Sequence, residues 1–193
     1  MASPRRQFLD LPLEIRLSIY NHLLFHPPID KLNPARPVKR LYPAILSASR
    51  QTNAEGTTIL YSKNMFLAHA TLLASFPRLR PWYPPIRERS VLPHIRRFHI
   101  RVRLDCDLAF DASAAAAAFS GVDELVIEVW QAVFQEADHA VLRVFERVRG
   151  VKHAKVYGSI TGFEGYARWL EGAIRHCGDD GGRIPLVTDG DQI

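Results

Sequence analysis

The sequence has few features of secreted, membrane or metal-binding proteins. It contains only two cysteines in 193 residues, Cys106 and Cys177, and no Cys-x-x-Cys pair. This spacing predicts neither a disulfide framework nor a zinc site. No segment approaches the roughly 18 consecutive apolar residues of a membrane span, and the first residues lack the apolar stretch of a secretory signal. We therefore expect an intracellular protein, cytoplasmic or nuclear, without membrane contact.

Motifs of the common enzyme classes are also missing. There is no Gly-x-Ser-x-Gly, no His-Glu-x-x-His and no Gly-x-Gly-x-x-Gly. The glycine-rich run at 178–182 follows a predicted helix and lacks the Lys-Ser or Lys-Thr of a phosphate-binding loop. Asp105 and Asp107 end a predicted strand, where such a pair is typical of a turn or helix cap. We expect a protein that is not an enzyme, with no catalytic residues, no cofactor and no metal.

The composition is that of a folded protein with a basic segment. The chain is 47% hydrophobic and 23% charged, which fits one or two globular domains, and its net charge is +5. Between Arg78 and Arg103 there are eight arginines and a single acid, Glu88. With Trp82 and Tyr83 as stacking residues, this segment leaves nucleic-acid binding open as an alternative function.

An amphipathic helix is predicted near the start of the chain. Asp10 is placed to cap its first amides, and Pro12 suits a first helical turn. Apolar residues recur every four positions at Ile15, Ile19 and Leu23, so one side of this helix needs burial. Leu11 and Leu24 widen the stripe, while Arg16, Ser18, Asn21 and His22 fall on other faces.

Two motifs in residues 8–66 resemble the F-box. The first is LP-x-EIR-x-x-IY-x-x-LL, from Leu11 to Leu24, in the form found in F-box-like proteins of filamentous fungi. The second runs from Ile45 through the Arg50-Gln51 pair and Glu55 to Leu60-Tyr61. A Pro-rich insertion, 26–42, lies between them.

The resemblance implies a substrate-recognition subunit that docks on the Skp adaptor of a cullin ubiquitin ligase. A helix stripe buried in a groove of the partner is a common mode of such docking. The residues expected at the adaptor are Leu11, Pro12, Ile15, Ile19, Leu23, Leu24, Ile45 and Leu46. The same stripe is equally expected of a stand-alone scaffold that buries it as its own core.

The second half of the chain predicts a small parallel sheet. The pattern apolar-x-x-apolar-x-apolar occurs three times, starting at Ile95, Val122 and Val151. Helical stretches at 114–118 and 136–148 separate the three, and another at 163–174 follows them. Strand and helix alternation predicts parallel strands with right-handed crossovers. The unit resembles a leucine-rich repeat.

We therefore expect an α+β fold in which F-box-like helices pack on a small parallel, leucine-rich-repeat-like β/α sheet. The expected segments are an F-box-like module at 8–66, a linker at 67–94 with a short helix and a Pro-rich basic loop, a repeat-like domain at 95–177 and a flexible tail at 178–193.

The repeat pattern also predicts the strand register. It places Arg97 beside Glu124, Arg101 beside Glu128 and Arg103 beside Trp130, so the outward face alternates in charge. Alternating charges favour neutralised pairs between neighbouring strands over a uniform basic surface for nucleic acid. This face is therefore the candidate surface for an unknown target protein. Its residues are Arg97, Arg101, Arg103, Glu124, Glu128, Trp130, Lys155 and Tyr157.

Overall fold

The computed structural model describes residues 7–27, 40–132 and 139–177. The described residues form two compact units. The helical unit comprises residues up to Met65 together with Glu88–Arg96, and the sheet unit comprises Phe66–Arg87 and the residues from Arg97 onward. The fold is mixed α+β, as expected from the sequence. None of its described helices is long and apolar enough to cross a membrane.

In its described residues, the helical unit contains two α-helices and three short 3-10 turns. Its elements are η1 (Phe8–Asp10), α1 (Leu13–Leu24), η2 (Pro43–Ser47), α2 (Arg50–Lys63) and η3 (Leu92–His94). Helix α2 begins where the Ser49 hydroxyl accepts a hydrogen bond from the Thr52 amide, which satisfies one of the free amides of the first turn. Ile45 and Leu46 belong to η2 and not to this helix.

The sequence prediction for the start of α1 was wrong in one respect. Asp10 does not cap the helix, because its carboxylate accepts the Gln7 amide within η1 at 2.7 Å. Pro12 directly precedes the helix and offers no side-chain cap. The other end of α1 is held by Asn64, whose buried amide donates to the carbonyl oxygens of Leu24 and Leu60 at 2.8 Å.

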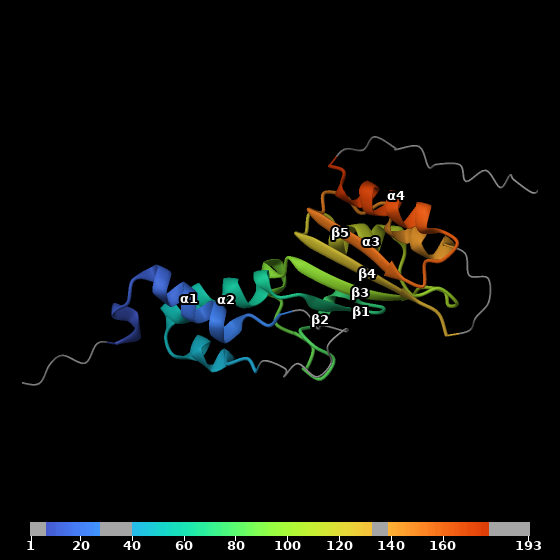
Figure 1. Cartoon of the computed structure of the whole chain (residues 1–193). Helices are drawn as coiled ribbons and strands as arrows, with labels where there is room; N and C mark the ends of the chain where they lie inside the picture. Colours follow the sequence, from blue (N-terminus) through green and yellow to red (C-terminus); the bar gives the residue numbers. More distant parts are fainter. Residues whose placement is uncertain (1–6, 28–39, 133–138, 178–193) are drawn as a thin grey trace, which may run out of the picture. The chain divides into compact units, whose positions relative to one another are not determined.

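The part of the sheet unit that the structure describes forms five strands in the order β2-β1-β3-β4-β5. Strands β1, β3, β4 and β5 are mutually parallel, and β2 is antiparallel to β1. The elements are β1 (Phe66–His69), β2 (Leu73–Arg78), β3 (Arg97–Arg103), α3 (Ala112–Phe119), β4 (Glu124–Trp130), η4 (Ala140–Phe145), β5 (His153–Gly158) and α4 (Glu164–Arg175). Figure 1 shows α3 and α4 together on one side of this sheet.

One face of the sheet is the core of this unit. Its fully buried aliphatic side chains, among them Ile100 and Ile127, alternate with outward residues along β3 and β4. The Phe119 ring of α3 packs edge-on against Phe98 with 5.5 Å between ring centroids, and Phe145 of η4 contacts Phe119. The described helices of the unit therefore cover this face, and none of them lies on the opposite, helix-free face.

Several predicted boundaries are corrected. The expected linker at 67–94 contributes most of β1 and all of β2 to the sheet. Only residues 139–148 of the expected helix at 136–148 are described, and there the chain forms the 3-10 turn η4. Most of the Pro-rich insertion, 28–39, and the tail, 178–193, lie outside the described residues.

Helix α3 gives a first testable prediction. Its cap is Asp111, whose carboxylate accepts the Ala114 amide at 2.8 Å. Asp111→Ala should lower the free energy of unfolding of the sheet unit by about 1 kcal/mol, because one amide of the first turn loses its partner. Urea unfolding measures this difference. Asp111→Asn keeps an accepting oxygen and should cost much less, so an equal loss in both variants would contradict the capping role.

Candidate functional site

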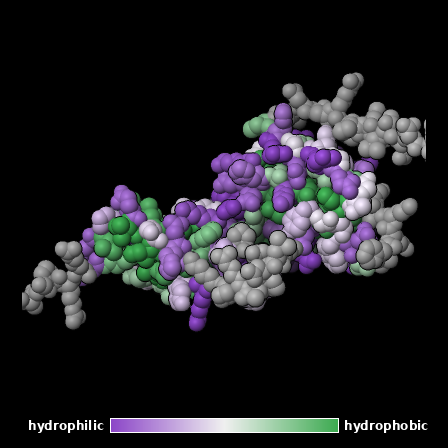
Figure 2. Space-filling model, in the orientation of Figure 1, coloured by the Kyte–Doolittle hydropathy of each residue, from purple (hydrophilic) through white to green (hydrophobic). Residues whose placement is uncertain are grey.

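The buried face of helix α1 is not the face that the apolar periodicity predicted. The buried side chains are Arg16, Tyr20 and Leu24. Ile15 lies far around the helix from them and is 49% exposed. Leu13, in the first turn, is 45% exposed. Figure 2 shows hydrophobic side chains gathered on the surface over this part of the helical unit.

The residues expected at an adaptor interface fall into three groups. Pro12 and Ile15 are exposed, Leu11, Ile19, Leu23, Ile45 and Leu46 are half-buried, and Leu24 is buried. Leu24 and Leu46 both approach Gly56 of α2, where an added Cβ would collide with the Leu46 side chain and lie 3.1 Å from Leu24. These two residues are therefore part of the packing between helices, while Ile15, Ile19 and Leu23 follow an outer flank of α1.

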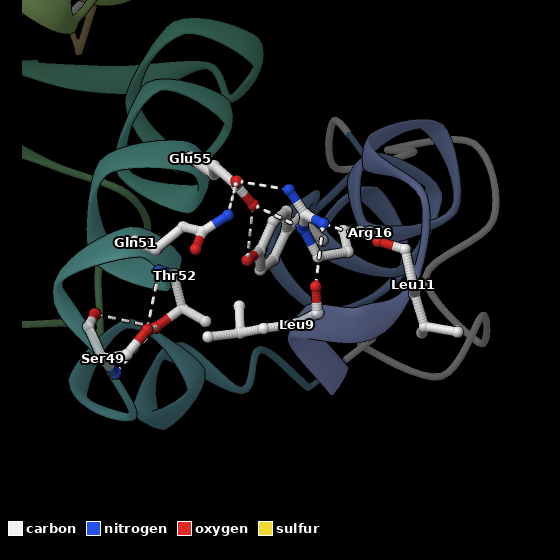
Figure 3. A network of polar contacts seen from close by, with 8 residues as sticks. Leu9, Leu11, Arg16, Ser49, Gln51, Thr52 and Glu55 are labelled. Carbon is white, nitrogen blue, oxygen red and sulfur yellow. Dashed lines mark hydrogen bonds and ion pairs between the residues drawn. The ribbon is translucent and has the colours of Figure 1, made fainter. Parts of the chain in front are cut away.

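Arg16 and Glu55 form the central ion pair of the helical unit (Figure 3). The guanidinium donates two hydrogen bonds to the carboxylate, Nη2 to Oε1 at 2.7 Å and Nε to Oε2 at 3.0 Å. The side chains are 10% and 17% exposed. A bidentate arginine–carboxylate pair that is largely shielded from water is much stronger than a surface pair.

Other groups complete this network. The Arg16 guanidinium also donates to the Leu11 carbonyl oxygen, and Tyr20 and Gln51 both donate to the Glu55 carboxylate, at 3.0 and 2.9 Å. The hydrogen bonds from Arg16 lower the pKa of Glu55 to about 2. Burial raises the pKa of the Tyr20 hydroxyl to about 12. The network joins the turn before α1, α1 itself and α2.

Sequence periodicity missed this network because it treats Arg16 as an outward polar residue. Nothing in the spacing of Arg16 and Glu55, 39 positions apart, shows that they meet. The only sequence feature that pointed to this network was the pair of F-box-like motifs, because they contain all four of its residues, Arg16, Tyr20, Gln51 and Glu55. The structure brings these four side chains to one place.

The outward face of the sheet has the register that the sequence predicted. Arg97 is paired with Glu124, Arg101 with Glu128 and Arg103 with Trp130, and on the far side of β4 Val126 is paired with Lys155 and Glu128 with Tyr157. All eight residues of the candidate target surface therefore lie on the helix-free face.

Ion pairs neutralise part of this face. Arg97 donates to the Glu124 carboxylate, and Glu128 lies 3.0 Å from His99 and 3.7 Å from Arg101. Arg103 makes two hydrogen bonds of 2.7 Å to Asp105, and they hold the pKa of that carboxyl well below its usual range. The predicted contact of Arg103 with the Trp130 ring is confirmed, with 5.4 Å to the ring centroid, and Arg101 lies at the same distance.

The arginine-rich segment 78–103 does not form one basic stripe. Arg80 is buried with 3% exposure, and Arg97 and Arg103 are committed to carboxylates. Its residues are also divided between the two units. This arrangement disfavours the nucleic-acid alternative.

A cavity of about 640 Å³ opens on the helix-free face of the sheet. Its lining comes from β1, β2, β3, the last residue of β4 and the segment after β3, and includes His69, Arg78, His99, Arg101, Arg103, Cys106, Asp107 and Trp130. Because β3 ends at Arg103 and β4 at Trp130, the cavity lies toward the carboxyl ends of the parallel strands. Open α/β sheets commonly bind ligands at this edge. Sequence reasoning anticipated Arg101, Arg103 and Trp130 as surface residues but did not predict a cavity.

Across residues 7–27, 40–132 and 139–177, no group of three or more His, Cys, Asp or Glu side chains is placed to hold a metal ion. No protein-family model matches the chain, and no curated protein or solved structure shows significant similarity to it.

Proposed function

We propose that this protein is a non-enzymatic interaction module, in which α1 docks on an adaptor protein and the outward face of the sheet receives a target. The observation that carries the proposal is the outer flank of α1. This helix is fixed in its unit by Arg16, Tyr20 and Leu24, yet it leaves Ile15 about half exposed. A helix that presents apolar residues beside a firmly packed face is suited to a groove in a partner.

The partner we propose is a Skp-type adaptor of a cullin ubiquitin ligase. Support comes from the F-box-like motifs, whose polar positions Arg16, Gln51 and Glu55 meet in one network. Such a network gives α1 and α2 one defined arrangement. The helical unit would then act as the F-box-like part of a substrate-recognition subunit, and the consecutive parallel strands would act as a leucine-rich-repeat-like surface for the target.

A stand-alone scaffold predicts no exposed apolar patch around Ile15 and Ile19; Ile19 is half-buried and Ile15 is 49% exposed. The exposure of Ile15 and Leu13 therefore favours docking over a purely internal role for the stripe. Loss of adaptor binding in a folded variant distinguishes the two functions.

Ile15→Asp should abolish co-purification with a Skp adaptor from a filamentous fungus, because a charge would enter an apolar contact. The side chain is exposed, so the circular dichroism spectrum and melting temperature should stay close to those of the wild type. Leu72→Asp is the matched control, since Leu72 is also 49% exposed but belongs to the sheet unit. The proposal fails if the wild type does not bind, or if Ile15→Asp folds and binds like the control.

A further inference from the structure

The cavity on the helix-free face has the size and lining of a binding site. Its volume of about 640 Å³ lies within the range of small-ligand and peptide pockets. Leu67, Ala68 and Phe76 supply apolar surface, and the lining also includes three arginines, Arg78, Arg101 and Arg103. Among its lining residues Asp107 is the single carboxylate. Asp105 and Glu128 pair with Arg103 and Arg101 beside the cavity, so its cationic character depends on Arg78 and on the exposed Arg101.

The three arginines are held in different ways. Arg103 is neutralised by Asp105, with which it makes two hydrogen bonds. Arg101 is 59% exposed, and its ion pair with Glu128 is long, at 3.7 Å. Arg78 donates one hydrogen bond, of 3.3 Å, to the Pro81 carbonyl oxygen. Arg101 and Arg78 thus retain donors for an incoming anion.

The Trp130 ring contacts two of the three arginines, Arg101 and Arg103. The guanidinium groups of Arg101 and Arg103 both lie 5.4 Å from the centroid of its ring. Stacking on a ring limits the rotamers of a long side chain, so less conformational entropy is lost when it binds. The planar guanidinium then presents a pair of donors that match a carboxylate.

We propose that this cavity binds an acidic segment of a target protein, with Arg101 and Arg78 contacting its carboxylates and Trp130 positioning Arg101. The surrounding face favours a peptide over a nucleic acid. Glu124 and Glu128 lie on the same face and would repel a continuous row of phosphates. The Trp130 ring already contacts two guanidinium groups and is less available for stacking on bases. This inference depends on the proposed function in one respect: it assumes that the ligand of the cavity belongs to a target protein.

Binding of a fluorescein-labelled, glutamate-rich peptide containing one phenylalanine tests the proposal, by fluorescence anisotropy with the full chain. Arg101→Gln should weaken binding about tenfold, as expected for loss of a charged hydrogen-bonding group. Arg168→Gln is the matched control because Arg168 is an exposed residue of α4, outside the cavity lining. It should bind like the wild type. Equal losses in both variants, or no binding by the wild type, would overturn the proposal.

The two cysteines locate the bound peptide. Cys106 lines the cavity and Cys177 does not, and both are exposed. Bound peptide should slow alkylation of Cys106 and leave Cys177 unaffected, which mass spectrometry can follow at each site. Equal protection of both thiols, or of neither, would place the peptide elsewhere.

Inorganic phosphate and a single-stranded oligonucleotide distinguish the sources of the anion. Phosphate should fail to displace the labelled peptide, and the oligonucleotide should bind more weakly than the peptide. Displacement by phosphate at the peptide's own concentration would identify a small-anion site, and tighter binding of a single-stranded oligonucleotide through Arg101 would identify a nucleic-acid site. Either result overturns the peptide proposal. The peptide assay contains no adaptor, so absence of peptide binding would not contradict the docking of α1. Absence of adaptor binding would likewise not contradict peptide binding in the cavity.

Discussion

Gly158→Ala should lower the free energy of unfolding of the sheet unit by about 3 kcal/mol or more. Gly158 ends β5 with φ of +114°, a conformation that side chains other than glycine rarely adopt. A Cβ at this position would collide with the Val129 carbonyl oxygen of the neighbouring strand. This oxygen also accepts the Ser159 amide at 2.9 Å. The obstacle is backbone of β4, so it cannot move aside as a flexible side chain would.

Variants of two other glycines separate the cost of the backbone conformation from the cost of the collision with β4. Gly162 has φ of +93° with open space around it, so Gly162→Ala should show the backbone cost alone, about 1 to 2 kcal/mol. Gly165 lies in α4 with open space and an ordinary φ, so Gly165→Ala should be neutral or stabilising by up to about 1 kcal/mol. Urea unfolding of the three variants measures the order. If Gly162→Ala costs as much as Gly158→Ala, the approach to β4 is not the cause.

The register of β3, β4 and β5 could be predicted because its determinants are local and repeated. Each strand carries the same short apolar pattern, and a parallel sheet aligns equivalent positions of consecutive repeats. A shift by one residue would place Arg97 or Glu124 in the core and bring Phe98 to the surface. Alternation of charged and aliphatic residues therefore specifies both the faces and the pairing.

The inward face of α1 could not be predicted in the same way. Helical periodicity predicts that Ile15 and Ile19 are buried and that Arg16 faces the solvent. The buried ion pair reverses this order, because Glu55 compensates the charge of Arg16 inside the unit. A partner 39 residues away leaves no periodic trace around Arg16.

The strands β1 and β2 were missed for a different reason. Both are short, and β2 contains Pro77, which argues against a strand in the middle of a sheet. The structure places β2 at the edge, where a missing amide is tolerated. Without these strands, the wall of the cavity that carries His69 and Arg78 could not be anticipated.

Loss of one partner of the Arg16–Glu55 pair should destabilise the helical unit strongly. Both Glu55→Gln and Arg16→Met should lower the melting temperature by about 10 °C, because each leaves the other group shielded from water with fewer partners. The double variant should lose less than the sum of the two. Circular dichroism at several temperatures measures the effect, and faster amide hydrogen exchange in α1 and α2 would locate it. Additive losses would mean that the two side chains stabilise the unit independently.

The pH dependence of this loss follows from the pKa of Glu55. Hydrogen bonds from Arg16 lower it from 4.5 to about 2 in the folded protein. A carboxylate with a lowered folded pKa contributes stability that is complete above the unfolded pKa and is lost as pH falls toward the folded one. The gap in melting temperature between wild type and Glu55→Gln should therefore be widest above about pH 5 and should close as the pH falls toward about 2. Other carboxylates titrate in both proteins and largely cancel in the difference. A gap that stays constant over this range would mean that the charge of Glu55 does not hold α1 and α2 together, and that the contribution of the side chain is one of packing.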